Sequence, residues 1–101
     1  MNPQPKSNKY RNSRLTQSAQ HEACDSCGAN DSTIVWAHSN ENFHGKGMGI
    51  KAHDIFGAYL CRKCHSSFDD NLAEYEGIHR PLWFRKMWER SMIIACEKGY
   101  L

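Results

Sequence analysis

The chain has 101 residues, a formal net charge of +2 and five cysteines. This length fits one small domain, which buries a limited share of its surface and is often stabilised by a metal or by disulfides. No apolar run is long enough for a transmembrane helix, and the first residues lack the apolar core of a secretory signal. We therefore expect a soluble, cytoplasmic protein without a membrane partner, in which thiols stay reduced.

Charge is unevenly distributed along the chain. Residues 1–20 carry four cations and no acid, residues 21–80 carry five cations and nine acids, and residues 81–101 carry four cations and two acids. Basic ends suit a polyanion such as DNA, whereas a central group of carboxylates suits a hard cation. A solvated tail and an ordinary helix surface would give the same pattern, and charge alone therefore leaves nucleic-acid binding open.

The first half of the chain predicts an arm and a hairpin. Residues 1–20 are polar and basic, which predicts a flexible basic arm, and the folded domain is expected over residues 21–101. A β-branched and aromatic run predicts a strand over residues 32–37, and an apolar run predicts a second, antiparallel strand over 55–60. The polar, glycine-rich residues 38–53 between them predict a long loop. The expected fold class is α+β.

Two helices are predicted after the second strand. The first is expected from His65 to about residue 75, with Phe68 and Leu72 on its apolar side. The second begins at Pro81, runs to about residue 97 and stops before Gly99. Apolar residues recur along this helix at steps of three and four, which predicts a face in the core. These residues are Phe84, Met87, Trp88, Met92 and Ala95.

Four of the five cysteines form two Cys-x2-Cys pairs. The pairs can set their thiolates one tetrahedral edge apart and close the four-cysteine site that structural zinc prefers. The predicted zinc ligands are Cys24, Cys27, Cys61 and Cys64. Two disulfides or a redox pair are the alternatives, although a redox pair needs a βαβ pattern that the sequence lacks. Cys96 lies among apolar residues of the last helix, and we expect it to be buried there.

Histidines and carboxylates cluster around the same elements. His38 follows the first predicted strand, Asp54 closes the long loop, and His65 directly follows the second cysteine pair. Asp69 comes four residues after His65, and a helix would put both side chains on one face, where they could share a metal. Structural alternatives exist for each: a strand-end histidine, a turn carboxylate, a neighbour or fourth ligand of the zinc site and a helix-surface acid.

Together these residues resemble the HNH, or His-Me finger, family of ββα-metal nucleases. The residues that carry the resemblance are Ala37, His38, Asp54, Cys61, Cys64, His65 and Asp69. More narrowly, residues 45–61 resemble a family of small phage and prophage proteins that were long of unknown function. The resemblance covers residues 18–101. It implies a small ββα-metal finger with two zinc knuckles and an additional C-terminal helix.

The resemblance also implies roles. His38 is expected to be the general base, Asp54 to orient that base or to help bind metal, and His65 with Asp69 to hold a catalytic Mg²⁺ or Mn²⁺. A histidine with its ordinary pKa near ~6.5 can accept a proton at neutral pH, and a hard cation can bind the scissile phosphate. The chain departs from many HNH proteins in three ways: Ala37 takes the place of a metal ligand, Asp69 takes the place of a histidine, and Asp54 lies farther before Cys61, by seven residues.

The expected function is a metal-dependent endonuclease that hydrolyses phosphodiester bonds in DNA, encoded by a phage or prophage and acting in the bacterial cytoplasm. The residues expected to contact the DNA backbone are Lys46, Lys51, Arg62 and Lys63. The alternative is a non-catalytic zinc module that binds nucleic acid or protein through the same cysteine pairs. Such a module needs no strand-end histidine, middle carboxylate or His–Asp pair, and their joint presence favours the enzyme.

Overall fold

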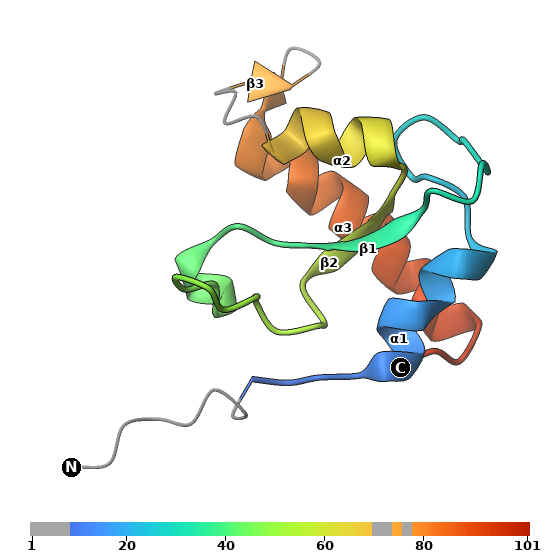
Figure 1. Cartoon of the computed structure of the whole chain (residues 1–101), viewed down its shortest axis with the longest axis horizontal. Helices are drawn as coiled ribbons and strands as arrows, with labels where there is room; N and C mark the ends of the chain where they lie inside the picture. The colour runs from blue at the N-terminus through green and yellow to red at the C-terminus, as the bar shows by residue number, and fades with distance from the viewer. Residues whose placement is uncertain (1–8, 70–73, 76–77) are drawn as a thin grey trace.

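The computed structural model describes residues 9–69, 74–75 and 78–101, in which a two-stranded hairpin packs against a long C-terminal helix (Figure 1). Strands β1 (Val35–His38) and β2 (Gly57–Leu60) pair antiparallel, with His38 opposite Gly57. Both strands overlap the predicted runs and are shorter than predicted. The α+β class and the antiparallel pairing are therefore confirmed.

The C-terminal helix α3 (Arg80–Glu97) supplies much of the core. Its buried residues recur at the helical period and are Trp83, Phe84, Met87, Ser91 and Ala95. Trp88 and Met92, which were predicted on the same face, are partly buried against this core. The backbone N–H of Tyr59 donates to Ser91 Oγ at 3.0 Å, which ties α3 to β2.

The end of α3 has the predicted glycine stop. Gly99 adopts a positive φ of 75°, where L-residues are disfavoured. Its N–H donates to the Cys96 carbonyl at 3.2 Å, and the Tyr100 N–H donates to the Ala95 carbonyl at 2.9 Å, as in a Schellman motif. The predicted burial of Cys96 is wrong, because the side chain is exposed. One residue of rotation, about 100°, separates it from the buried Ala95.

Helix α2 (Arg62–Asp69) follows β2 directly, and it starts earlier and ends sooner than predicted. The predicted helix end near residue 75 is wrong, because β3 (Glu74–Tyr75) pairs antiparallel with β4 (Ile78–His79). Tyrosine and isoleucine favour extended backbone, which fits this short ladder. Leu72, predicted on the apolar side of the helix, lies outside the described residues.

Residues 9–20 differ from the predicted flexible arm. They contain α1 (Ser13–Gln17) and the start of a 3₁₀ helix, η2 (Ser18–His21). Leu15 is fully buried in the core, and Asn12 caps α1 by accepting the Leu15 N–H at 3.1 Å. The polar composition of the segment conceals the spacing of Leu15 and Ala19, which lie on one helical face. The rest of the predicted arm, residues 1–8, lies outside the described residues.

Glu22, which directly follows η2, binds the C-terminal end of the chain. Its carboxylate is buried and accepts hydrogen bonds from Lys98 Nζ at 2.8 Å and from the Tyr100 hydroxyl at 3.0 Å. These hydrogen bonds raise the pKa of both donors. None of the helices within the described ranges combines the length and apolar character needed to cross a membrane.

Candidate metal and catalytic site

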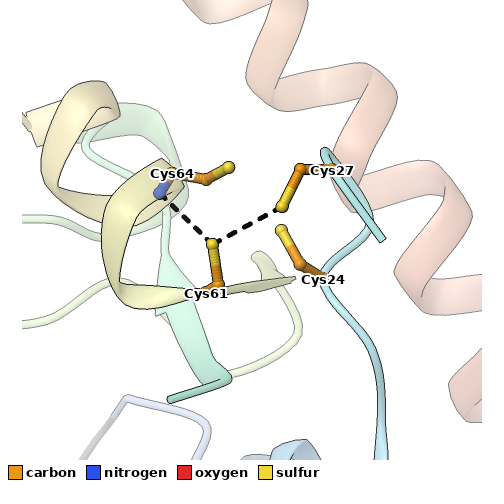
Figure 2. Close-up of side chains that lie close together, drawn as sticks. All are labelled: Cys24, Cys27, Cys61 and Cys64. Atoms are coloured by element: carbon orange, nitrogen blue, oxygen red, sulfur yellow. Dashed lines mark hydrogen bonds between the residues drawn. The ribbon is translucent and has the colours of Figure 1, made fainter. Parts of the chain in front are cut away.

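The four predicted zinc ligands meet at one end of the hairpin. Their sulfur atoms all lie within 4.8 Å of one another, and Figure 2 shows them converging from the segment before β1 and from the β2–α2 junction. Cys27 Sγ and Cys61 Sγ are 3.7 Å apart. Metal–sulfur bonds of about 2.3 Å in a tetrahedron would give an edge of about 3.8 Å. The cysteine cluster (Cys24, Cys27, Cys61 and Cys64) can therefore hold a metal ion.

Tight turns point the sulfur atoms inward. The Cys24 carbonyl accepts the Gly28 N–H at 2.9 Å, and Gly28 has a positive φ of 79°. A residue with a side chain is strained at such a φ, which accounts for glycine directly after the first cysteine pair. In the second pair, the Cys64 N–H points at Cys61 Sγ at 3.5 Å. The second turn therefore places a backbone donor beside sulfur.

The thiols of the cluster differ in acidity. Burial raises the pKa of Cys64 to about 12. Burial acts in the same direction on Cys61, but hydrogen bonds from the Cys64 N–H and neighbouring thiols outweigh it and lower the pKa of Cys61. Thiolates packed this closely repel one another, and their joint deprotonation needs a cation between them. The donor set thus favours a thiolate-binding metal.

His38 lies at the end of β1 and is paired with Asp54. Nε2 of His38 is 2.7 Å from Oδ1 of Asp54, and the carboxylate is buried, with 5% of its side chain exposed. Trp36 fixes the backbone of the same aspartate, because its Nε1 donates to the Asp54 carbonyl at 2.7 Å. The indole lies over Gly57, where a Cβ atom would come within 2.3 Å of Nε1. The strand pair thus requires glycine opposite His38.

The N-terminal segment completes the surroundings of Asp54. The Asn12 N–H donates to Oδ2 at 2.6 Å, and Arg11 NH1 contacts Oδ1 at 3.3 Å. Arg11 also donates to the carbonyls of Lys51 and Ala52, at 3.0 and 2.6 Å. Sequence reasoning missed both contacts. Asn12 before a short apolar spacing was the available signal, since asparagine is a frequent N-cap.

The second predicted pair lies on α2. His65 Nε2 and Asp69 Oδ2 are 3.0 Å apart, four residues apart in sequence, and their side chains are 36% and 48% exposed. An octahedral cation with bonds of about 2.1 Å has adjacent donors about 3.0 Å apart. The pair therefore fits two corners of such a site. Asn40, which sequence reasoning did not single out, donates from Nδ2 to Asp69 Oδ1 at 3.4 Å.

The two pairs line different surface cavities. His38 and Asp54 face a cavity of about 370 Å³ with Arg11, and His65 and Asp69 face one of about 530 Å³ with Val35. Side chains alternate along a strand, which puts His38 and Val35 on opposite faces of β1. Among the described residues, the cysteine cluster is the only group of three or more His, Cys, Asp or Glu donors. Within the part of the chain that the structure describes, no third donor of these types joins His65 and Asp69.

The four basic residues that were expected to contact DNA lie at different places on the surface. Lys51 lines the His38 cavity, Arg62 lines the His65 cavity, and Lys63 joins Arg62 along a third, neighbouring one. Lys46 instead donates to the Gly47 carbonyl at 3.0 Å within the long loop. Three of the four side chains therefore border the cavities of the candidate site or lie beside them.

The whole sequence was compared with known protein families, curated proteins and solved structures. A family model covers residues 2–95. The chain belongs to the DUF968 family, described as a protein of unknown function. No curated protein and no solved structure matches the chain. The description of the family assigns no activity, and the function is therefore proposed from the chemistry of the site.

Proposed function

We propose that this member of the DUF968 family is an HNH-type, metal-dependent endonuclease that hydrolyses phosphodiester bonds in DNA. The observation that carries the proposal is the pairing of His38, at the end of β1, with the buried carboxylate of Asp54 at 2.7 Å. A histidine held by a buried carboxylate is a recurring arrangement for general-base catalysis. The β1–β2–α2 order, with paired cysteines before and after the hairpin, supports the same proposal.

The proposed base acts through its second ring nitrogen. With the proton on Nε2 donated to Asp54, Nδ1 is left as an acceptor, and no described residue bonds to it. This tautomer lets Nδ1 take a proton from the attacking water. Arg11 and Asn12 also donate to Asp54 and hold its carboxylate in the orientation that bonds to His38.

His65 and Asp69 are proposed to hold a catalytic Mg²⁺ or Mn²⁺. A hard cation there would shield charge on the scissile phosphate and stabilise the leaving 3′ oxygen. The two side chains supply one imidazole and one carboxylate donor, and water and phosphate would fill the other positions, as is usual for Mg²⁺. Arg62, at the edge of the same cavity, is suited to hold the DNA backbone.

The cysteine cluster is proposed to bind one structural zinc. Four thiolates in tetrahedral spacing suit zinc better than the hard cations that prefer oxygen. The site ties the segment before β1 to the start of α2, and it therefore supports the helix that carries His65. Its role is to position the helix rather than to react.

The test is a metal titration of DNA cleavage. His38→Ala should lower the rate by about 10²–10⁴-fold at every Mn²⁺ concentration, because proton transfer is lost. His65→Ala and Asp69→Ala should instead shift the rate to higher Mn²⁺, with partial recovery. The exposed Lys86→Ala on α3 serves as a control and should cleave like wild type. A His38→Ala variant that cleaves at the wild-type rate would contradict the proposed mechanism.

A non-catalytic zinc module that binds nucleic acid or protein is the second candidate. It is favoured by the separation of His38 and the His65–Asp69 pair into two cavities and by the buried Ala37 in place of a ligand. If wild-type protein loaded with zinc cleaves neither plasmid nor single-stranded DNA with Mg²⁺, Mn²⁺ or Ni²⁺, this candidate replaces the nuclease.

A further inference from the structure

A further cavity, of about 360 Å³, lies beside the proposed site, and five of its eleven lining residues are aromatic. The 3₁₀ helix η3 (Asn42–His44) supplies Phe43 and His44, α2 supplies Phe68, and α3 supplies Phe84 and Trp88. None of these rings belongs to the proposed base, the cation pair or the cysteine cluster. We call this the aromatic cavity.

Most rings of the aromatic cavity are fixed in place. Phe68 and Phe84 stack with their centroids 4.9 Å apart, and Trp88 Nε1 donates to the Ile55 carbonyl at 2.6 Å. His44 is bonded through Nδ1 to Ser39 Oγ at 2.6 Å. Phe43 differs from the others, because 79% of it is exposed although it is a large apolar side chain. It stands edge-on to His44, with centroids 4.5 Å apart.

Polar groups at the aromatic cavity suit a flat, hydrogen-bonding ligand. Asn40 and Glu41 line it and together offer amide and carboxylate groups. Arg85 lines the same cavity and adds a cation. Flat heteroaromatic rings that both stack and form hydrogen bonds match this combination better than an aliphatic side chain does.

Asn40 links the aromatic cavity to the proposed cation pair. Its side chain lines the cavity and also donates to Asp69 at 3.4 Å. Phe68, a cavity wall, is the residue before Asp69 on α2. A group held at Asp69 and a ring held in the cavity would therefore lie side by side, as the phosphate and the base of one nucleotide do.

We propose that the aromatic cavity binds an unpaired nucleobase of a DNA strand whose backbone passes the His65–Asp69 pair. A base inside a duplex is stacked and paired and must leave the stack to enter such a cavity. The site therefore selects single-stranded or unpaired DNA over intact duplex. The substrate form rests on the proposed nuclease, whereas binding of the base does not require cleavage.

The experiment measures binding without cleavage. Zinc-loaded full-length protein is titrated, without added Mg²⁺ or Mn²⁺, into a labelled single strand, the same strand with abasic sugars, and a blunt duplex. Wild type should bind the intact strand about five- to 150-fold more tightly than the abasic strand, the range that stacking of one base supports. Phe43→Ala and Phe43→Leu should lose this preference, and Phe43→Tyr, which keeps a ring, should retain it.

Met48→Ala is the matched control. Met48 is an apolar side chain in the same loop, is 99% exposed and does not line the aromatic cavity. It should keep the wild-type preference, and an equal loss in Met48→Ala would overturn the inference. Equal affinity of wild type for intact and abasic strands would overturn it as well, even if the protein cleaves DNA. A base preference that depends on Phe43 in a protein that cleaves nothing would uphold the cavity and refute the nuclease.

Discussion

Asp54 receives hydrogen bonds from two separate parts of the chain. His38 reaches it from β1, and Arg11 and Asn12 reach it from the segment before α1. A buried carboxylate with several donors is held in one orientation, and the histidine bonded to it is held as well. The orientation of the proposed base thus depends on residues that precede the hairpin by more than twenty positions.

His44 predicts a measurable pH dependence of stability. Burial lowers its pKa below the ordinary 6.5, although Glu41 opposes the shift. The unfolded chain therefore binds this proton at a higher pH than the folded chain does. The contribution to stability is fully present above 6.5 and is lost as the pH falls from 6.5 to the folded pKa.

His44→Gln should therefore lose less stability than wild type between about pH 7.5 and pH 5. The measurement is the urea midpoint of unfolding at several pH values in this range. His21→Gln, at an exposed histidine, is the control and should retain the wild-type dependence. If His44→Gln and wild type show parallel pH curves, the histidine is not the group responsible.

At the scale of elements, the cysteine cluster predicts a metal-dependent fold. Protein purified without chelator should contain about one zinc per chain, and Cys61→Ser should lose zinc and much of its folded signal, because metal binding contributes directly to folding. Cys96→Ser should keep both, since Cys96 is exposed and lies outside the cluster. Elemental analysis and circular dichroism measure the two quantities. Wild-type protein that is fully folded without zinc would refute a structural role of zinc at the cysteine cluster.

At the short helix α1, a core substitution should lower the stability of the fold. Leu15 is fully buried in the core, and Leu15→Ala should lower the free energy of unfolding by about 2–5 kcal/mol. Ile93→Ala removes comparable apolar volume from α3 at a side chain that is 60% exposed, and its effect should stay within about 0.5 kcal/mol. Denaturant unfolding compares the two. Equal effects would mean that α1 is not part of the cooperative fold.

At the scale of the whole molecule, two sets of contacts hold together segments that are distant in sequence. The cysteine cluster joins the segment before β1 to the β2–α2 junction, and Glu22 binds Lys98 and Tyr100 near the other end of the chain. In a domain with little core, such contacts between distant segments add cooperativity.

The basic residues predict a salt-dependent affinity for DNA. Arg62 and Lys63 are both exposed and line neighbouring cavities at the start of α2. If both contact phosphates, Arg62→Gln with Lys63→Gln should reduce the slope of log affinity against log salt by about two units. Binding titrations at several salt concentrations measure this slope. Lys86→Gln on α3 should leave it unchanged, and an unchanged slope in the double variant would place the DNA elsewhere.

Local sequence patterns determined a large part of this fold. The apolar period of residues 81–97 predicted the buried face of α3, and glycine predicted its end at Gly99. The two cysteine pairs predicted their own convergence, because thiols that share a tetrahedral site need fixed spacing within each pair. The i, i+4 spacing predicted the contact of His65 with Asp69. Each of these signals lies within a few residues of the chain or in a repeated motif.

The tertiary structure alone decided which distant residues meet. Arg11 and Asp54 are separated by 43 positions, and no local pattern connects them. The docking of α1 depends on the burial of Leu15 in the core. The polar residues around Leu15 in the sequence give no sign of this burial. The aromatic cavity likewise assembles rings from η3, α2 and α3, each of which could serve as ordinary core by its own spacing. A periodic pattern reports which face of an element is apolar, whereas the partner of that face is set by packing across the whole chain.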